Sequence, residues 1–179
     1  MAKGRRLVAP DGLQTRPTQD KTREALFSMI QTYVPDAHVL DLFGGTGALA
    51  LEAMSRGAGK AVICDISRPA QKAIETNIRT VLGEANGAIL IKSDYRAALK
   101  QLSDQKFDLV FLDPPYADEA AYHNSLSFIL EHDMLSDDAL VIVEKCRDSS
   151  ISYPERFTVI KSRNYSDTVI ELLTKEETL

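Results

Sequence analysis

The chain has 179 residues, of which 44% are hydrophobic and 26% charged, values close to those of ordinary globular proteins, so disorder, coiled coil and collagen-like structure are disfavoured. Its apolar runs are only a few residues long, far short of the roughly 20 that a membrane-spanning helix needs. Two cysteines cannot build a disulfide framework, and they form no metal-ligand pattern with the three histidines. We expect one domain without a metal, in the reducing cytoplasm.

The net charge of −5 is unevenly distributed along the chain. Residues 1–23 carry six basic and two acidic side chains, a net charge of +4, which leaves −9 for the remainder. A basic segment of this kind suits contacts with nucleic-acid phosphates, and a solvated arm has the same composition. We expect residues 1–17 to form a basic arm or a small hairpin, and residues 18–179 to form a single domain.

The first regular element expected is a helix over residues 18–33, with Pro17 and Thr18 at its start. Its buried face, at helical spacing, is expected to consist of Thr22, Leu26, Met29, Ile30 and Tyr33.

From residue 38 onward, short β-branched runs alternate with amphipathic stretches, which is typical of a parallel sheet with helices on both faces. The expected strands are residues 38–42, 60–65, 87–92, 107–113, 139–144, 156–162 and 168–173. The expected helices between them are residues 47–55, 68–82, 95–103 and 119–131. Only Tyr165, Ser166 and Asp167 separate the last two strands, so these should form an antiparallel hairpin.

A glycine-rich turn follows the first of these strands. Gly45, Gly47 and Ala50 satisfy the dinucleotide pattern GxGxx(G/A), and Asp65 ends the next strand 20 residues later. A nicotinamide-dependent oxidoreductase is therefore one hypothesis. Asp41 argues against it, because a carboxylate at the mouth of the turn repels a pyrophosphate. The same carboxylate suits a ligand with an ammonium group and no phosphate there, such as S-adenosylmethionine.

A second motif, Asp113-Pro114-Pro115-Tyr116, follows the apolar strand that begins at Phe107. Two prolines remove two backbone donors and fix an extended path, so the carbonyls of Asp113 and Pro114 can act as acceptors. Acceptors on both N–H bonds of an exocyclic amine orient its lone pair and stabilise the positive charge that develops during methylation. Tyr116 would stack on the base. A loop that only ends the strand is the simpler interpretation.

The fold should bring the two motifs together. Ligands of doubly wound sheets bind where the strand order reverses, which in the order 3-2-1-4-5 falls between the strands ending at Asp41 and Asp113. Ser93, Asp94 and Tyr95 follow the third strand. Asp94 has two interpretations there, as an acceptor for the adenine amino group of a cofactor or as a helix N-cap.

The ordered motifs LDLFGGTGALALEA, CDIS, KSDY and FLDPPY resemble those of class I S-adenosylmethionine-dependent methyltransferases that act on amino groups. With GRRL near the start and the segment from Thr15 to Phe27, nearly the whole chain is similar to RsmD-type bacterial enzymes, which methylate guanine N2 in small-subunit (16S) ribosomal RNA. The resemblance implies a Rossmann-like α/β fold with seven strands in the order 3-2-1-4-5-7-6. Two departures are a shorter segment before GRRL and Tyr165-Ser166 in place of a tyrosine-glycine turn.

The resemblance also implies roles for particular residues. The cofactor, S-adenosylmethionine, would be held by Asp41, Phe43, Gly44, Gly45, Gly47, Asp65, Ile66, Ser93, Asp94 and Tyr95. The target amine would be served by Asp113, Pro114, Pro115 and Tyr116, and the RNA by Lys3, Arg5, Arg6 and Arg16. The implied partner is ribosomal RNA, alone or within an assembling small subunit, and the protein is expected to act as a monomer.

Several other functions share parts of this pattern. Methyltransferases of DNA adenine N6 and of protein glutamine N5 share the (D/N)PPY motif and its use of acceptors for an amino group, although DNA enzymes usually need a further recognition segment. The oxidoreductase and a non-catalytic binding module are weaker hypotheses. A cytosine C5 methyltransferase is disfavoured, because Cys64 is expected to be buried in the second strand and not to act as a nucleophile.

Overall fold

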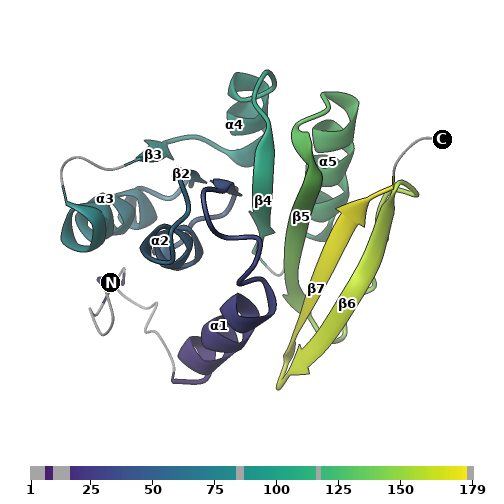
Figure 1. The fold of residues 1–179 in the computed structure, drawn as a ribbon, viewed down its shortest axis with the longest axis horizontal. Coiled ribbons are helices and arrows are strands. Elements are labelled where there is room, and N and C mark those ends of the chain that lie inside the picture. The colour runs from purple at the N-terminus through teal and green to yellow at the C-terminus, as the bar shows by residue number, and fades with distance from the viewer. Residues whose placement is uncertain (1–6, 10–16, 84–86, 116–117, 177–179) are drawn as a thin grey trace.

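The computed structural model describes residues 7–9, 17–83, 87–115 and 118–176 (Figure 1). For residues 17–19 it describes the backbone alone. The strands are β1 (His38–Asp41), β2 (Lys60–Cys64), β3 (Ala88–Ile91), β4 (Phe107–Leu112), β5 (Leu135–Cys146), β6 (Phe157–Tyr165) and β7 (Thr168–Lys175). The helices are α1 (Pro17–Met29), α2 (Ala48–Ser55), α3 (Arg68–Leu82), α4 (Tyr95–Gln101) and α5 (Glu119–Glu131). No helix among these residues is long and apolar enough to cross a membrane.

The strands form one sheet in the order β3-β2-β1-β4-β5-β7-β6. β1 to β5 run parallel, and β7 is antiparallel to both of its neighbours, β5 and β6. The expected α/β fold, strand order and hairpin are therefore confirmed. The strand order reverses between β1 and β4, where Val39 pairs with Leu109, so the ends of these two strands are adjacent.

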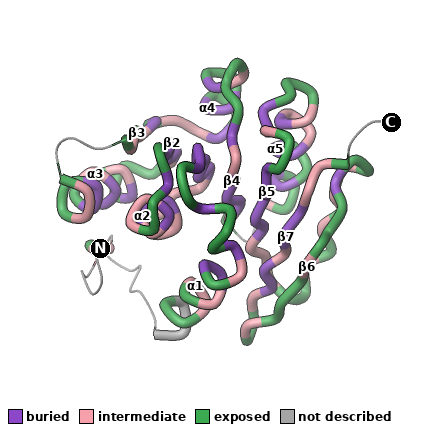
Figure 2. Tube along the Cα trace, viewed as in Figure 1, coloured by how far each residue is buried: buried purple, intermediate pink, exposed green. Residues whose placement is uncertain are grey.

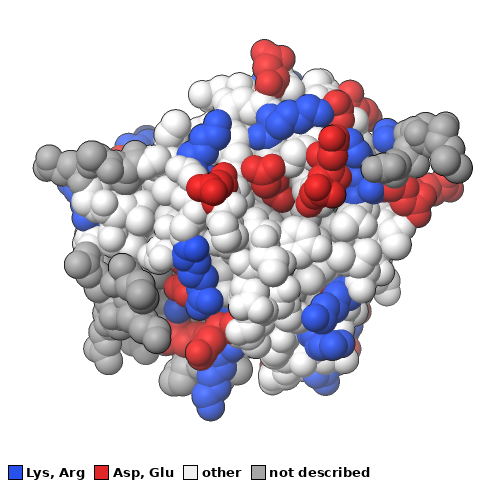
Figure 3. Space-filling view, in the orientation of Figure 1, with Lys and Arg blue, Asp and Glu red and all other residues white. Residues whose placement is uncertain are grey.

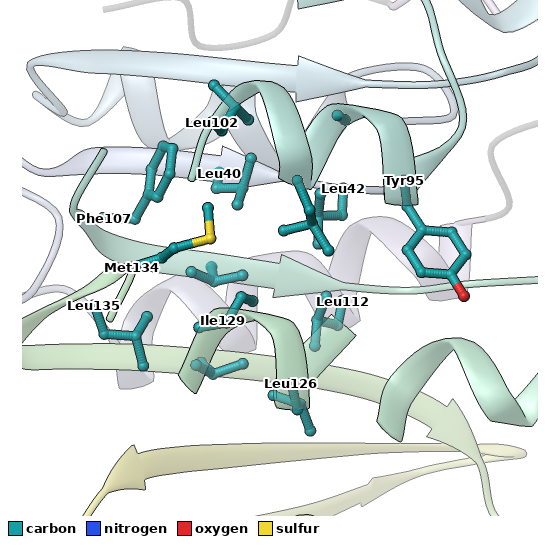
Figure 4. Close-up of a cluster of buried hydrophobic side chains, with 14 of the residues drawn as sticks. Leu40, Leu42, Tyr95, Leu102, Phe107, Leu112, Leu126, Ile129, Met134 and Leu135 are labelled. Atoms are coloured by element: carbon teal, nitrogen blue, oxygen red, sulfur yellow. The ribbon is translucent and has the colours of Figure 1, made fainter. Parts of the chain in front are cut away.

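Helices cover both faces of the sheet. α1, α2 and α3 lie on the face toward the viewer in Figure 1, and α4 and α5 lie behind it. Buried side chains gather along both faces, whereas β6 is largely exposed (Figure 2). On the α4–α5 side, Leu40, Leu112, Leu126 and Met134 belong to one core cluster (Figure 4). Alternation along each strand sends the neighbouring residues into the second cluster, beneath α1 to α3.

Two element boundaries differ by four residues from the sequence-based prediction, and the other boundaries differ by three residues or fewer. α1 ends at Met29, not at residue 33, because the Tyr33 N–H bonds to the Ile30 carbonyl oxygen at 2.9 Å and turns the chain toward β1. Ile30 is buried as expected, but Tyr33 is exposed. β5 begins at Leu135, four residues earlier than expected, because Leu135 pairs with Phe107 ahead of an irregularity in the β4–β5 register.

Candidate active site

The turn between β1 and α2 depends on its glycines for two different reasons. Gly45 and Gly47 have φ angles of +57° and +76°, in the left-handed region that favours glycine. Gly44 approaches β2 closely: its N–H donates to the Cys64 carbonyl oxygen at 2.8 Å, and a Cβ there would lie 2.4 Å from Cγ2 of Ile63. Apart from Gly45 and its two chain neighbours, no heavy atom of the described residues lies within 4 Å of the position that a Cβ on Gly45 would occupy. A ligand can therefore approach the backbone at Gly45.

Asp41 ends β1 and is 2% exposed. Its carboxylate accepts hydrogen bonds from the backbone N–H groups of Phe43 and Ala50, the second of which belongs to α2. Burial raises the pKa of Asp41 to about 7, and the nearby charge of Asp65 adds to this shift. No salt bridge among the described residues neutralises it. A cationic group supplied by a ligand would therefore stabilise its ionised form.

Asp65 follows β2 and ties the turn to that strand. Its Oδ2 accepts from the Gly45 N–H and its Oδ1 from the Ser67 N–H, both at 2.8 Å. A carboxylate oxygen has more than one acceptor site, so Asp65 keeps the capacity to accept from ribose hydroxyls. The next residue, Ile66, is 70% exposed and offers an apolar surface beside it.

Asp94 follows β3 and is the N-cap of α4. Its Oδ1 accepts from the N–H groups of Arg96 and Ala97 at 2.8 and 3.2 Å, so the capping interpretation is confirmed. The adenine contact stays a prediction. Ser93 donates from Oγ to the Asp94 carbonyl oxygen at 3.2 Å. Tyr95 is buried, with its ring centroid 5.3 Å from that of Phe43, so β1 and α4 are joined beside the turn.

Asp113 follows β4 and is half-buried. Burial raises its pKa well above the ordinary value, and the charges of Glu144 and Asp41 raise it further. Pro114 is buried and Pro115 exposed, and the Pro115 carbonyl oxygen accepts from the Asp118 N–H at 2.8 Å as α5 begins. Asp41 and Asp113 thus lie close enough for their charges to interact. Tyr116 lies outside the described residues.

Glu144 was not among the residues predicted for the site. Leu112 pairs with Val143, so Asp113 and Glu144 are the next residues of two adjacent parallel strands. Leu112 and Val143 face α4 and α5, so alternation directs Asp113 and Glu144 to the face of α1 and α2. Burial raises the pKa of Glu144 as well. Its one sequence signal is that it ends the apolar run of β5.

Asn77 is a second residue that the sequence did not suggest. It lies in α3 and is fully buried. Its Nδ2 donates to the carbonyl oxygens of Val8 and Thr46 at 2.8 and 2.9 Å, and its Oδ1 accepts from the Val8 N–H at 2.7 Å. Asn77 therefore joins the segment at residues 7–9 to the glycine-rich turn.

The described residues among those predicted for the cofactor and the target amine thus lie at the carboxyl ends of β1 to β4, with Glu144 added from β5. The candidate RNA contacts Lys3, Arg5, Arg6 and Arg16 lie outside the described residues. Although the site is acidic, the described part of the chain holds no group of three or more His, Cys, Asp or Glu residues arranged to bind a metal. Cys64 is buried in β2, and burial raises the pKa of its thiol to about 12, as expected for a structural cysteine.

The strand order, the glycine-rich turn and the acidic residues at the ends of parallel strands define a class I methyltransferase domain. The chain belongs to the family of ribosomal RNA small subunit methyltransferase D, and residues 1–174 match the family model described as conserved hypothetical protein 95. It is 32% identical to ribosomal RNA small subunit methyltransferase D of Haemophilus influenzae, covering 90% of this chain and 83% of the relative. It is 34% identical to the protein of that name from Escherichia coli K12, covering 79% and 70%.

A solved structure agrees with this assignment. A protein from Escherichia coli described as a proposed methyltransferase superposes with a TM-score of 0.85, at 27% sequence identity, covering 98% of this chain and 94% of the other.

Proposed function

We propose that this protein transfers a methyl group from S-adenosylmethionine to the exocyclic N2 amine of a guanine in small-subunit ribosomal RNA. The observation that carries the proposal is the position of the Asp113-Pro114 segment at the end of β4, next to the buried Asp41 at the end of β1. This arrangement brings a binding site for a cationic cofactor and acceptors for an amine to one edge of the sheet.

The residues present fit S-adenosylmethionine. Asp41 is buried without a basic partner among the described residues, and an ammonium group would supply the missing charge. Asp65 has acceptor capacity for a ribose diol, and the exposed Ile66 offers a surface for the adenine. The bound cofactor supplies the methyl group: the methyl–sulfur bond breaks as the methyl–nitrogen bond forms, and the amine loses one proton.

The end of β4 suits the acceptor side of this reaction. An exocyclic amine is a weak nucleophile because its lone pair is delocalised into the ring. The ionised Asp113 carboxylate and the carbonyl oxygens beside it would accept hydrogen bonds from both N–H groups of the amine. These hydrogen bonds would orient the lone pair and stabilise the developing positive charge. Tyr116 is proposed to hold the plane of the base by stacking.

The choice of ribosomal RNA, as naked RNA or within an assembling small subunit, is supported by the names of the relatives at 32% and 34% identity. The choice of guanine N2 is supported by the motif resemblance described above. The same acceptor arrangement would serve adenine N6 in DNA or glutamine N5 in a protein, so the substrate must be tested directly. We expect the enzyme to act as a monomer.

The test is transfer of labelled methyl groups from S-adenosylmethionine to 16S ribosomal RNA from an Escherichia coli strain that lacks its own small subunit methyltransferase D. Purified RNA, intact small subunits, adenine-rich DNA and total protein are offered in parallel. We expect label in N2-methylguanosine after nucleoside analysis of one or both RNA samples. Label only in DNA or protein, or no transfer to any of them, would refute the proposal.

A further inference from the structure

Three side chains lie in line on one face of the edge strand β6. Lys161 pairs with Leu172, Arg163 with Ile170 and Tyr165 with Thr168 across the β6–β7 ladder. Leu172 and Ile170 both belong to the core cluster beneath α1 to α3, so their β6 partners share that face of the sheet. We call Lys161, Arg163 and Tyr165 the β6 row.

The β6 row is in register with the candidate active site. Arg163 pairs with Ile170, Ile170 pairs with Glu144, and Glu144 is the β5 neighbour of Asp113. Asp113 and Arg163 are therefore separated by three strand spacings on one face, about 14 Å at about 4.8 Å each. At about 3.4 Å for each nucleotide of a stacked strand, this corresponds to roughly four nucleotides.

The basic side chains of the β6 row are accessible and uncompensated. Arg163 is exposed and Lys161 half-exposed, and no salt bridge among the described residues engages either one. The opposite face differs, because there Lys145 pairs with Glu171 at 3.0 Å. In Figure 3, Lys and Arg side chains stand at the lower right, where Figure 1 shows the lower half of the β6–β7 hairpin.

Charged residues on an edge strand also prevent strand pairing between molecules, which is the simpler explanation. A charge at any position along the edge strand would fill that role, and the register irregularity between Val159 and Lys161 already distorts the edge. It does not account for two cations on the face that leads to Asp113, or for the half-buried Tyr165 ring that follows them. Basic side chains combined with an aromatic ring are typical of surfaces that bind single-stranded nucleic acid.

We infer that the β6 row binds the phosphate backbone of the substrate RNA a few nucleotides from the target guanine. The inference rests on the proposed function and adds a docking surface to it. Lys161 and Arg163 contact phosphates, and the Tyr165 ring stacks on a base. The complementary charge on the RNA identifies this polyanion as the occupant, rather than a second copy of the chain, which would bring the same positive charges.

The test compares Lys161→Gln/Arg163→Gln with the control Lys60→Gln/Lys100→Gln, which removes the same charge from the start of β2 and from α4. The probe is the 16S ribosomal RNA described above, either protein-free or within intact small subunits, whichever of the two accepts the methyl group from the wild type. In the β6 variant we expect the KM for RNA to rise about 10-fold or more, with kcat and S-adenosylhomocysteine affinity unchanged. The slope of log affinity against log salt should become shallower by about 2. The control variant should behave like the wild type in kcat, KM and cofactor affinity.

Each outcome has a distinct meaning. Absence of methylation by the wild-type protein on both protein-free RNA and intact small subunits would refute the proposed function itself. Methylation by the wild type with equal KM and equal salt slopes in the two variants would overturn only the inference. Loss of cofactor binding in the β6 variant, or an equal rise in KM in the control variant, would overturn it as well.

Tyr165 gives an independent measurement. Tyr165→Ala should raise the KM for RNA about 10-fold, because base stacking is lost, while Tyr165→Phe keeps the ring and the wild-type KM. Equal KM values for the two variants would show that the ring does not stack on the RNA.

Discussion

Asp41 is a buried carboxylate whose proposed role in binding the cofactor requires it to be ionised. Its pKa is raised to about 7, mainly by burial, so the apo-protein holds it protonated below neutral pH. The ammonium group of the cofactor favours the ionised form. We therefore expect S-adenosylhomocysteine affinity, measured by calorimetry, to fall about tenfold per pH unit below pH 7 and to level off above it. Asp41→Asn should bind more weakly at pH 8 and show little pH dependence; a flat wild-type profile from pH 5.5 to 8 would contradict this role.

The raised pKa of Asp41 also makes the stability of the folded protein depend on pH. Between its ordinary value of 3.8 and its folded value of about 7, the folded state binds more protons than the unfolded state, so this group makes the protein less stable as pH rises. A shift of about 3 units corresponds to roughly 4 kcal/mol. Denaturant titrations of the apo-protein should show Asp41→Asn losing less stability than the wild type between pH 5 and 8. Parallel stability curves for the two proteins would show that Asp41 does not titrate in this range.

Asp113 is proposed to act in its ionised form. The neighbouring charge of Glu144 raises the pKa of Asp113 and so disfavours that form. Asp113→Ala should lower kcat about 100- to 1,000-fold, the range known for loss of one charge-stabilising hydrogen-bonding group, with cofactor affinity unchanged. The measurement is single-turnover methyl transfer at saturating cofactor. A kcat within tenfold of wild type would show that the Asp113 carboxylate is not an acceptor for the amine.

Glu144 offers a more specific test. Its charge raises the pKa of Asp113, so Glu144→Gln should lower that pKa and shift the rising limb of the pH–rate profile to lower pH. Saturating cofactor separates this effect from the titration of Asp41. If the limb stays in place while kcat falls uniformly, Glu144 acts only through packing.

At the scale of the elements, α3 connects the glycine-rich turn to the segment at residues 7–9 through Asn77. Asn77→Ala leaves three backbone groups of Val8 and Thr46 without their partner, so we expect a loss of about 1 to 3 kcal/mol in the free energy of unfolding, together with weaker cofactor binding. Thr76→Ala is the matched control, because this exposed hydroxyl bonds only within α3, to the Lys72 carbonyl oxygen. Its cost should stay below about 0.5 kcal/mol. Equal costs for the two variants would contradict the connecting role of Asn77.

The elements also explain what the sequence alone could predict. Strand order and the proximity of Asp41 and Asp113 were predictable, because each ends a short apolar run and parallel strands end at one edge. Glu144 was not, because its place beside Asp113 depends on the β4–β5 register, which contains an irregularity. Asn77 was not, because a polar residue within an amphipathic helix usually faces solvent, and only the packing of Val8 and Thr46 buries it.

At the scale of the whole molecule, an acidic protein must bind a polyanion. In Figure 3, acidic side chains lie in the upper half, among Lys and Arg side chains, and at the lower left, whereas Lys and Arg predominate at the lower right. Two basic segments are proposed to contact the RNA, the N-terminal arm predicted at residues 1–17 and the β6 row. Residues 7–9, which follow Arg5 and Arg6 in the sequence, bond to α3 beside the edge strand β3, whereas β6 is the other edge strand. The candidate active site lies between these two edges of the sheet.

Charge substitutions in the two segments are expected to act independently, because each segment is proposed to contact its own phosphates. Neutralising Arg5, Arg6 and Arg16 should make the salt dependence of RNA affinity shallower by about 3, and the Lys161→Gln/Arg163→Gln variant by about 2. In the combined variant the salt dependence of RNA affinity should be shallower by about 5, because each phosphate contact releases its own counterions. Filter-binding measurements across a salt series decide the matter, with cofactor affinity as the check on folding. A combined variant whose slope equals that of either parent would mean that the RNA engages one region at a time and does not span the site.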